Sequence, residues 1–218
     1  MNARARRQHE KQERRESILD AAEGVFFDKG FERSTMDDIA RGASLSRGLL
    51  YVYFRDKSDM LEAVMLRAAE TLRQRFRDVS EQGLCGREQI QAMGQAYYAF
   101  SVEEPDYFDL LTRAASDWPS AGTSGENLHG APDDSAMALC SGEVMQIMAA
   151  AIQRGMEDGS LNADHVHCPL QTALYLRGAL HGVIMLTRQE AGHDLPDETA
   201  AQALVSYTLD MLGVSLRA

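Results

Sequence analysis

The stretch Thr35–Lys57, TMDDIARGASLSRGLLYVYFRDK, decides how this chain of 218 residues is interpreted. Thr35 followed three residues later by Asp38 has the form of a capping box, which predicts the start of a short helix. Ser46 is a second N-cap residue and predicts the start of another short helix. Ser44 then falls in a tight turn between the two. Two short helices joined by three or four residues predict a helix-turn-helix.

The second predicted helix opens with residues suited to reading DNA. In a helix-turn-helix, the N-terminal residues of the second helix reach base edges in the major groove. Arg47 can form bidentate hydrogen bonds to guanine. Gly48 has no side chain, so the helix could approach the bases closely. Glycine inside a helix costs roughly 1 kcal/mol relative to alanine, which indicates either this role or a close packing contact within the protein.

Polar side chains around these helices complete the candidate DNA surface. Tyr51 and Tyr53 are either core residues or clamps on the phosphate backbone. Lys57 is expected at a helix N-terminus, where backbone N–H groups favour an anion. The same holds for Ser34 and Thr35 at the start of the first short helix. The predicted DNA-binding residues are Ser34, Thr35, Ser46, Arg47, Gly48, Leu49, Tyr51, Tyr53 and Lys57.

Residues 14–65 resemble the DNA-binding domain of the TetR family of bacterial transcriptional regulators. The residues that carry the resemblance are Ala21, Ala22, Phe26, Gly30, Phe31, Ser34, Thr35, Met36, Ile39, Ala40, Ala43, Leu45, Ser46, Gly48, Leu50, Tyr51, Tyr53, Phe54, Lys57 and Leu61. Ser44 stands where the family usually has a turn glycine. Residues 97–111, YYAFSVEEPDYFDLL, resemble a recurrent stretch of the family's C-terminal domain. The rest of the C-terminal half resembles the family only in the number and length of its helices.

Apolar residues recur with helical spacing almost throughout the chain, and no convincing strand alternation is visible. We therefore expect an all-α protein of about nine helices. Residues 1–13 form a basic N-terminal arm and residues 14–60 the three-helix domain with the helix-turn-helix. By the resemblance, residues 61–218 form a helical domain for ligand binding and dimerisation.

Charge is distributed unevenly along the chain. Residues 1–60 carry a net charge of +1 and residues 61–218 a net charge of −12, and the first fifteen residues alone carry +4. A basic end joined to an acidic body is typical of contact with a polyanion at one end, although a solvated tail has the same composition.

Composition restricts the class of protein and its surroundings. The 44% hydrophobic and 25% charged residues are ordinary for a soluble globular chain. The most apolar stretch, Leu174–Leu186, is too short to span a bilayer and carries Arg177 and His181. Three cysteines are too few for a disulfide scaffold. We therefore expect a cytoplasmic protein without membrane contact.

The resemblance implies a homodimer in which the last two long helices of each subunit pack together. Small residues on these helices would allow a close approach, and large apolar ones would supply buried area. An ordinary buried helix in a monomer would show the same composition. The predicted dimer residues are Leu174, Ala179, Gly182, Val183, Leu186, Leu204, Tyr207 and Met211.

The resemblance also implies a pocket for a small effector in the C-terminal domain. Its expected lining favours an apolar or aromatic ligand, and the acidic body favours a cation over an anion. The same residues could instead be plain core, and a buried Arg177 or His181 would need a ligand or an internal carboxylate as partner. The predicted ligand-binding residues are Met93, Tyr97, Phe100, Tyr107, Phe108, Leu111, Trp118, Met137, Met145, Met148, Ile152, Tyr175 and Arg177.

His165, His167 and Cys168 could reach one ion, but no second ligand motif accompanies them, so we expect no metal and no cofactor.

Three functions fit the sequence to different degrees. By the resemblance, the favoured function is a repressor that a small effector would release from a palindromic operator. An all-α enzyme or ligand carrier with an incidental basic arm would not need Arg47 and Gly48. An architectural DNA-binding protein without an effector would have a solid C-terminal core.

Overall fold

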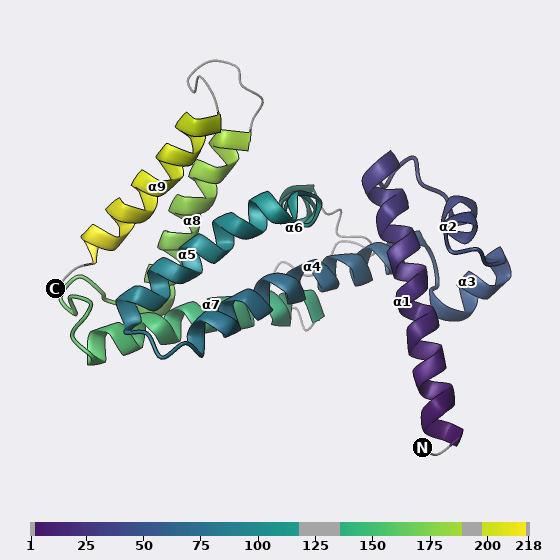
Figure 1. Ribbon diagram of the computed structural model, residues 1–218, viewed down its shortest axis with the longest axis horizontal. Helices are drawn as coiled ribbons and strands as arrows, with labels where there is room; N and C mark the ends of the chain where they lie inside the picture. Colours follow the sequence, from purple (N-terminus) through teal and green to yellow (C-terminus); the bar gives the residue numbers. More distant parts are fainter. Residues whose placement is uncertain (1–2, 118–135, 189–197, 217–218) are drawn as a thin grey trace, which may run out of the picture. The chain divides into compact units, whose positions relative to one another are not determined.

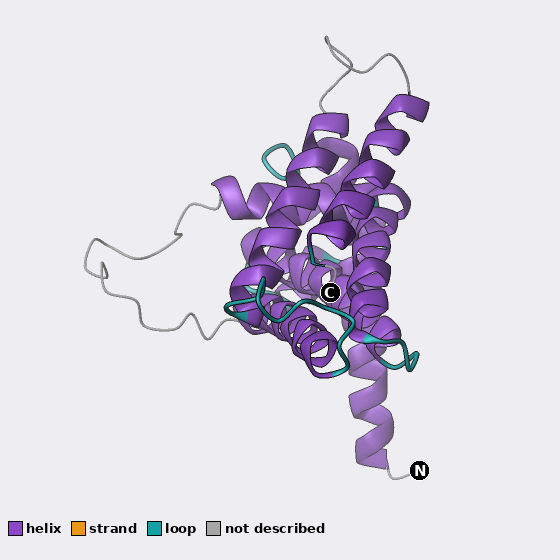
Figure 2. Cartoon of the chain, turned by 90° about the vertical axis from the view of Figure 1, so that its left-hand side faces the viewer, coloured by secondary structure: helices purple, strands orange, loops and turns teal. Residues whose placement is uncertain are grey.

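The computed structural model describes residues 3–117, 136–188 and 198–216. Within these ranges the chain forms nine helices and no strand (Figure 1, Figure 2), which confirms the all-α fold. The helices are α1 (Ala3–Lys29), α2 (Met36–Gly42), α3 (Arg47–Tyr53), α4 (Lys57–Ser80), α5 (Gly86–Glu103), α6 (Pro105–Asp117), α7 (Ala136–Glu157), α8 (Pro169–Arg188) and α9 (Glu198–Ser215). No helix in the described ranges is long and apolar enough to cross a membrane.

The chain divides into two compact units, Met1–Ala68 and Ala69–Ala218. Helix α4 belongs to both, so the division falls eight residues beyond the boundary expected at residue 60. The basic arm is also part of a larger element, because α1 begins at Ala3 and runs without a break to Lys29.

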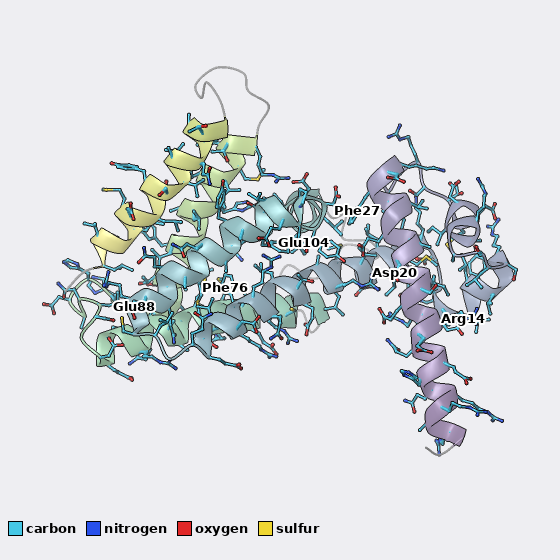
Figure 3. All side chains as sticks on the ribbon, in the orientation of Figure 1. Arg14, Asp20, Phe27, Phe76, Glu88 and Glu104 are labelled. Carbon is cyan, nitrogen blue, oxygen red and sulfur yellow. The ribbon has the colours of Figure 1, made fainter. Side chains whose placement is uncertain are left out.

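A cluster of ion pairs explains why the first half of α4 belongs to the N-terminal unit. The guanidinium of Arg67 lies 2.7 Å from Glu16, 2.8 Å from Asp20 and 3.0 Å from Glu23. These three carboxylates project from successive turns of α1, where Figure 3 labels Asp20. Only a quarter of the Arg67 side chain is exposed, so solvent screens these pairs less than pairs on the open surface.

Both predicted N-caps of the helix-turn-helix are confirmed. The Thr35 hydroxyl accepts a hydrogen bond from the Asp38 N–H at 3.1 Å, and the Asp38 carboxylate accepts from the Thr35 N–H at 3.2 Å. The Ser46 hydroxyl accepts from the Leu49 N–H at 3.3 Å. Four residues separate α2 from α3. Hydrogen bonds from Lys29 and from Thr35 lower the pKa of Asp38 to about 2, so the capping carboxylate is ionised at neutral pH.

Ser44 gives this turn an unusual backbone. The Leu45 N–H donates to the Ala40 carbonyl and the Ser44 N–H donates to the Arg41 carbonyl, which is the pattern of a Schellman motif. That motif places its C′ residue in the left-handed region, and Ser44 has φ 55°. The serine therefore keeps the turn that a glycine would form, at an energetic cost that glycine would avoid.

The C-terminal unit is built around α5, which contacts α6, α7, α8 and α9. One group of core residues surrounds Met93 and Ile152, and a second surrounds Phe100 and Ile184. At the start of α5, a Cβ added to Gly86 would lie 2.1 Å from the backbone nitrogen of Gly155 on α7. Glycine is required there because the two helix backbones nearly touch.

We predict that Ser44→Gly stabilises the protein by about 0.5–1 kcal/mol. The left-handed conformation costs an L-residue roughly 1–2 kcal/mol, and the larger conformational entropy of unfolded glycine offsets part of the gain. Urea unfolding followed by circular dichroism measures the change. Ser44→Ala is the control and should gain nothing, because alanine keeps the strain. A Ser44→Gly variant no more stable than the parent would contradict the assignment.

Candidate nucleic-acid interface and ligand cavity

Helix α3 buries one side and exposes its N-terminal end. Leu50 and the C-cap residue Phe54 are buried, with 0% and 2% of their surface exposed. The guanidinium of Arg15 on α1 lies 4.8 Å from the centre of the Phe54 ring. Arg47, Gly48 and Tyr51 are exposed, while Leu49 and Tyr53 are half-buried. The α3 end that sequence reasoning assigned to base recognition is therefore accessible within this chain.

Arg47 is held loosely at this end. Its guanidinium donates to the Tyr51 hydroxyl at 3.3 Å and lies 3.4 Å from a carboxylate oxygen of Asp37 on α2. The hydrogen bond to Tyr51 and then the charge of Asp37 raise the pKa of Arg47. With 56% of the side chain exposed, such a surface pair contributes little to stability. Arg47 can exchange these contacts for others without unfolding α3.

No packing contact within the described residues requires Gly48. A Cβ added to it would meet nothing within 4 Å, so the alternative of a close contact inside the protein is wrong for this structure. Gly48 lies next to the exposed Arg47 at the N-terminal end of α3.

The structure corrects the predicted roles of Ser34 and Lys57. Ser34 is buried, and its hydroxyl donates to the Gly30 carbonyl at 2.7 Å. It therefore satisfies a backbone carbonyl at the C-terminal end of α1 and does not face outward toward a phosphate. The Lys57 ammonium donates to the carbonyls of Phe31 and Ser34 and lies 4.1 Å from the Phe31 ring centre. The loop after α1 turns its carbonyls inward, and Lys57 supplies the donors that they require.

Apolar residues gather on the exposed face of α8 and α9. Of the predicted dimer residues, Leu174, Gly182 and Leu186 on α8 are exposed, as are Tyr207 and Met211 on α9. Ala179, Val183 and Leu204 are half-buried. Sequence reasoning missed Leu170 and Val214 on this face, and it wrongly placed Tyr175 in the ligand pocket. Tyr175 is 63% exposed and follows Leu174, which is 47% exposed, on the outer side of α8.

A hollow that opens to solvent lies in the C-terminal unit, and the space within its lining, open solvent included, is about 580 Å³. Its walls come from α4, α5, α7, α8 and α9, and from Leu161, which follows α7. Among the predicted ligand residues, Met93, Tyr97, Met148 and Arg177 line it. Phe76 of α4, labelled in Figure 3, also contributes to the wall.

Other predicted pocket residues belong to the core. Phe100, Phe108, Met145 and Ile152 are at most 7% exposed and lie outside the cavity lining. Tyr107 and Leu111 are half-buried and pack against the core around Phe100. These six side chains therefore pack in or against the two core groups and not along this cavity. Trp118 and the side chain of Met137 lie outside the described residues.

His181 has an internal partner other than the carboxylate considered from the sequence. Its Nδ1 and the Tyr97 hydroxyl share a hydrogen bond of 2.8 Å. Burial raises the pKa of Tyr97 to about 12. Burial, and then the charge of Arg177, lower the pKa of His181. Tyr97 is therefore protonated and His181 neutral near pH 7.

The His165–Cys168 segment follows α7. His165 and His167 are exposed and Cys168 is half-buried. Within the described ranges, no three His, Cys, Asp or Glu side chains are grouped so that they could hold a metal ion.

Two family models match the chain. The model described as bacterial regulatory proteins of the tetR family matches residues 18–64, and the tetracyclin repressor-like C-terminal domain matches residues 90–212. The second match alone spans more than half of the chain.

Characterised relatives are similar over shorter stretches. The HTH-type transcriptional repressor BepR of Brucella suis biovar 1 (strain 1330) is 45% identical over 56 residues, which are 26% of this chain and 27% of BepR. The HTH-type transcriptional activator FasR of Mycolicibacterium smegmatis is 30% identical over 99 residues, 45% of either chain. The matched stretches thus span less than half the length of these relatives.

Solved structures share the whole fold. SmeT, the repressor of the Stenotrophomonas maltophilia multidrug efflux pump SmeDEF, superposes with a TM-score of 0.67 over 94% of this chain and 90% of SmeT, at 21% identity. A Rhodococcus protein of unknown function gives a TM-score of 0.70 over 94% and 95% of the two chains, at 17% identity. The chain therefore belongs to the TetR family of bacterial regulatory proteins, whose members are DNA-binding transcriptional regulators rather than enzymes.

Proposed function

We propose that this protein is a cytoplasmic, homodimeric repressor that binds a near-palindromic operator and is released by a small, largely apolar or aromatic effector. The observation that carries the proposal is the exposed N-terminal end of α3, where Arg47 stands beside a glycine that the fold does not require. This end can enter a major groove without rearrangement of the helix-turn-helix.

The exposed face of α8 and α9 supports the dimer. Leu186 and Tyr207 each expose 62% of their surface, and Leu174 exposes 47%. A Cβ added to Gly182 on the same face meets nothing within 4 Å. Apolar side chains around a glycine of this kind suit the close approach of a second helix pair, and a contiguous apolar patch is typical of an interface.

Helix α4 supports the release mechanism. Arg67 binds carboxylates of α1, and Phe76, nine residues or about two and a half turns further along the helix, lines the cavity. A ligand that shifts α4 at Phe76 would therefore act on the element that Arg67 fixes to α1. Release requires the ligand to prefer one position of α4 over another. A coupling of roughly 1–3 kcal/mol, or 5–150-fold in operator affinity, is the usual scale.

The cavity favours this function over an architectural DNA-binding protein without an effector, which would have a solid core. The alternative of an enzyme or ligand carrier is set aside, since the chain belongs to a family of regulators. The relatives include both a repressor and an activator, so reporter expression with and without the protein decides the direction of regulation.

We predict that Arg47→Ala and Gly48→Ala weaken specific binding for different reasons. Arg47→Ala should reduce affinity for a site selected from random duplexes by about 5–150-fold and relax preference at one base pair. Gly48→Ala should also weaken binding, although it should stabilise α3 by about 1 kcal/mol. Fluorescence anisotropy measures the affinities and urea unfolding the stability.

Arg154→Ala, which removes a positive charge from α7, is the control for Arg47→Ala and should bind DNA like the parent. If Arg47→Ala keeps the sequence preference of the parent, or if Gly48→Ala binds as tightly, the assignment of this surface is wrong.

We predict that Gly182→Leu converts the dimer into monomers and abolishes operator binding. The added side chain enters open space within one chain, so the monomer fold should survive while the close approach of a partner is blocked. Gly142→Leu is a matched control, because Gly142 is an exposed helical glycine on α7 with equally open space. Sedimentation velocity gives the mass of each variant. A dimeric Gly182→Leu protein would refute this interface.

A further inference from the structure

We infer that the cavity binds an amphipathic carboxylate, with its unbranched or aromatic apolar body inside and its carboxylate at Arg87 and Arg177. The inference names the chemical class of the effector, and so it deepens the proposed function. It is opposite in sign to the expectation from the net charge of the C-terminal part, which favours a cation.

The interior of the cavity is apolar. Phe76, Met93, Met148 and Leu176 line it and are all at most 5% exposed. Leu180, which also belongs to the second core group around Phe100, closes another part of the wall. The Tyr97 hydroxyl is hydrogen-bonded to His181, and Gln91 in the lining is exposed. Such a wall holds hydrocarbon or an aromatic ring and offers little to a uniformly polar ligand.

Two arginines from different helices supply the charge of the lining. Arg87 lies on the first turn of α5 and is half-buried, and Arg177 lies on α8 and is exposed. The cavity lining in the described residues contains no Asp or Glu. His181, which contacts Tyr97, is neutral and adds no charge of either sign.

These two arginines, of which Arg87 is half-buried and Arg177 is exposed, differ from four partly covered arginines of the described chain. Arg67, Arg73, Arg75 and Arg188 have 18–26% of their side chains exposed, and each lies within 4 Å of a carboxylate. In the described ranges, neither Arg87 nor Arg177 forms an ion pair within that distance. Arginine presents a planar fork of donors that matches a carboxylate.

The carboxylates near the start of α5 are already engaged. Glu88, labelled in Figure 3, follows Arg87 in the chain, and its carboxylate accepts from the Cys85 N–H at 3.1 Å. Asp158 accepts from the Gly86 N–H at 2.8 Å and from the Ser160 N–H at 2.9 Å. Backbone donors therefore engage both carboxylates. Arg87 acts on Glu88 through its charge, but no carboxylate of the described residues forms an ion pair with the Arg87 guanidinium.

The test compares ligands that differ only in the head group. Isothermal titration calorimetry without DNA measures binding of decanoate, decanol and decylamine, and of 4-phenylbutyrate and 4-phenylbutanol. At least one acid should bind about 10-fold or more tightly than its alcohol, and decylamine should bind more weakly than decanoate. Acids that bind no better than their alcohols, or that do not bind at all, overturn the inference.

Variants then assign the preference to the two arginines. The double variant Arg87→Gln/Arg177→Gln should lose about 10-fold in acid affinity and keep its alcohol affinity within about 3-fold. Arg154→Gln, which removes a charge outside the cavity, is the control. Gly213→Leu should block acid and alcohol alike, because Gly213 lines the cavity and its added Cβ meets nothing within 4 Å. A double variant that still prefers the acid overturns the assignment.

A separate titration of the protein–DNA complex distinguishes the two proposals. If the acid binds but does not change DNA affinity, the ligand class stands and the release mechanism fails. If a neutral or cationic compound releases the DNA while both acids fail to bind, the regulator function stands and the carboxylate assignment is wrong.

Discussion

Arg67 and the three carboxylates of α1 form the interaction on which the N-terminal unit depends most clearly. One guanidinium on α4 meets charges from three turns of α1, so both the rotation and the register of α4 against α1 are fixed. Removing the guanidinium would leave the three carboxylates of α1 without this shared partner. Helix α4 continues from this cluster into the C-terminal unit. The proposed switch requires such an element.

Local signals in the sequence predicted the helix-turn-helix well, since its caps involve residues three apart. The same reasoning failed for Ser34 and Lys57. A serine or lysine near a helix N-terminus has the pattern of an anion contact. In the structure, however, the loop between α1 and α2 directs the carbonyls of Phe31 and Ser34 at Lys57, which lies 26 and 23 residues later in the sequence. Which groups a loop leaves unsatisfied depends on its path, and no spacing rule reveals that path.

The cavity shows a second limit of sequence patterns. Tyr97 lines the cavity whereas Phe100, one turn later on α5, lies in the core, although both belong to one apolar stripe. Because α5 is covered by α6, α7, α8 and α9, its apolar residues point toward several neighbours, and periodicity separates only buried from exposed. Arg87 was missed for the related reason that a single arginine on the first turn of a helix is usually solvated. Only the fold brings it to the same cavity as Arg177.

The glycines allow a finer distinction than conformational freedom alone. Gly86 is required by the chain itself, because any side chain there would collide with the backbone of α7. Gly48 and Gly182 lie in helices, where glycine is unfavourable, yet open space surrounds both of them. A close neighbour within the chain explains why a helical position is glycine. Where an added Cβ would meet nothing, packing within the chain gives no such explanation. Gly24, Gly142, Gly178 and Gly213 are also helical glycines with open space around an added Cβ. It is therefore the neighbouring residues, Arg47 on α3 and the exposed apolar side chains on α8, that connect Gly48 and Gly182 with the proposed surfaces.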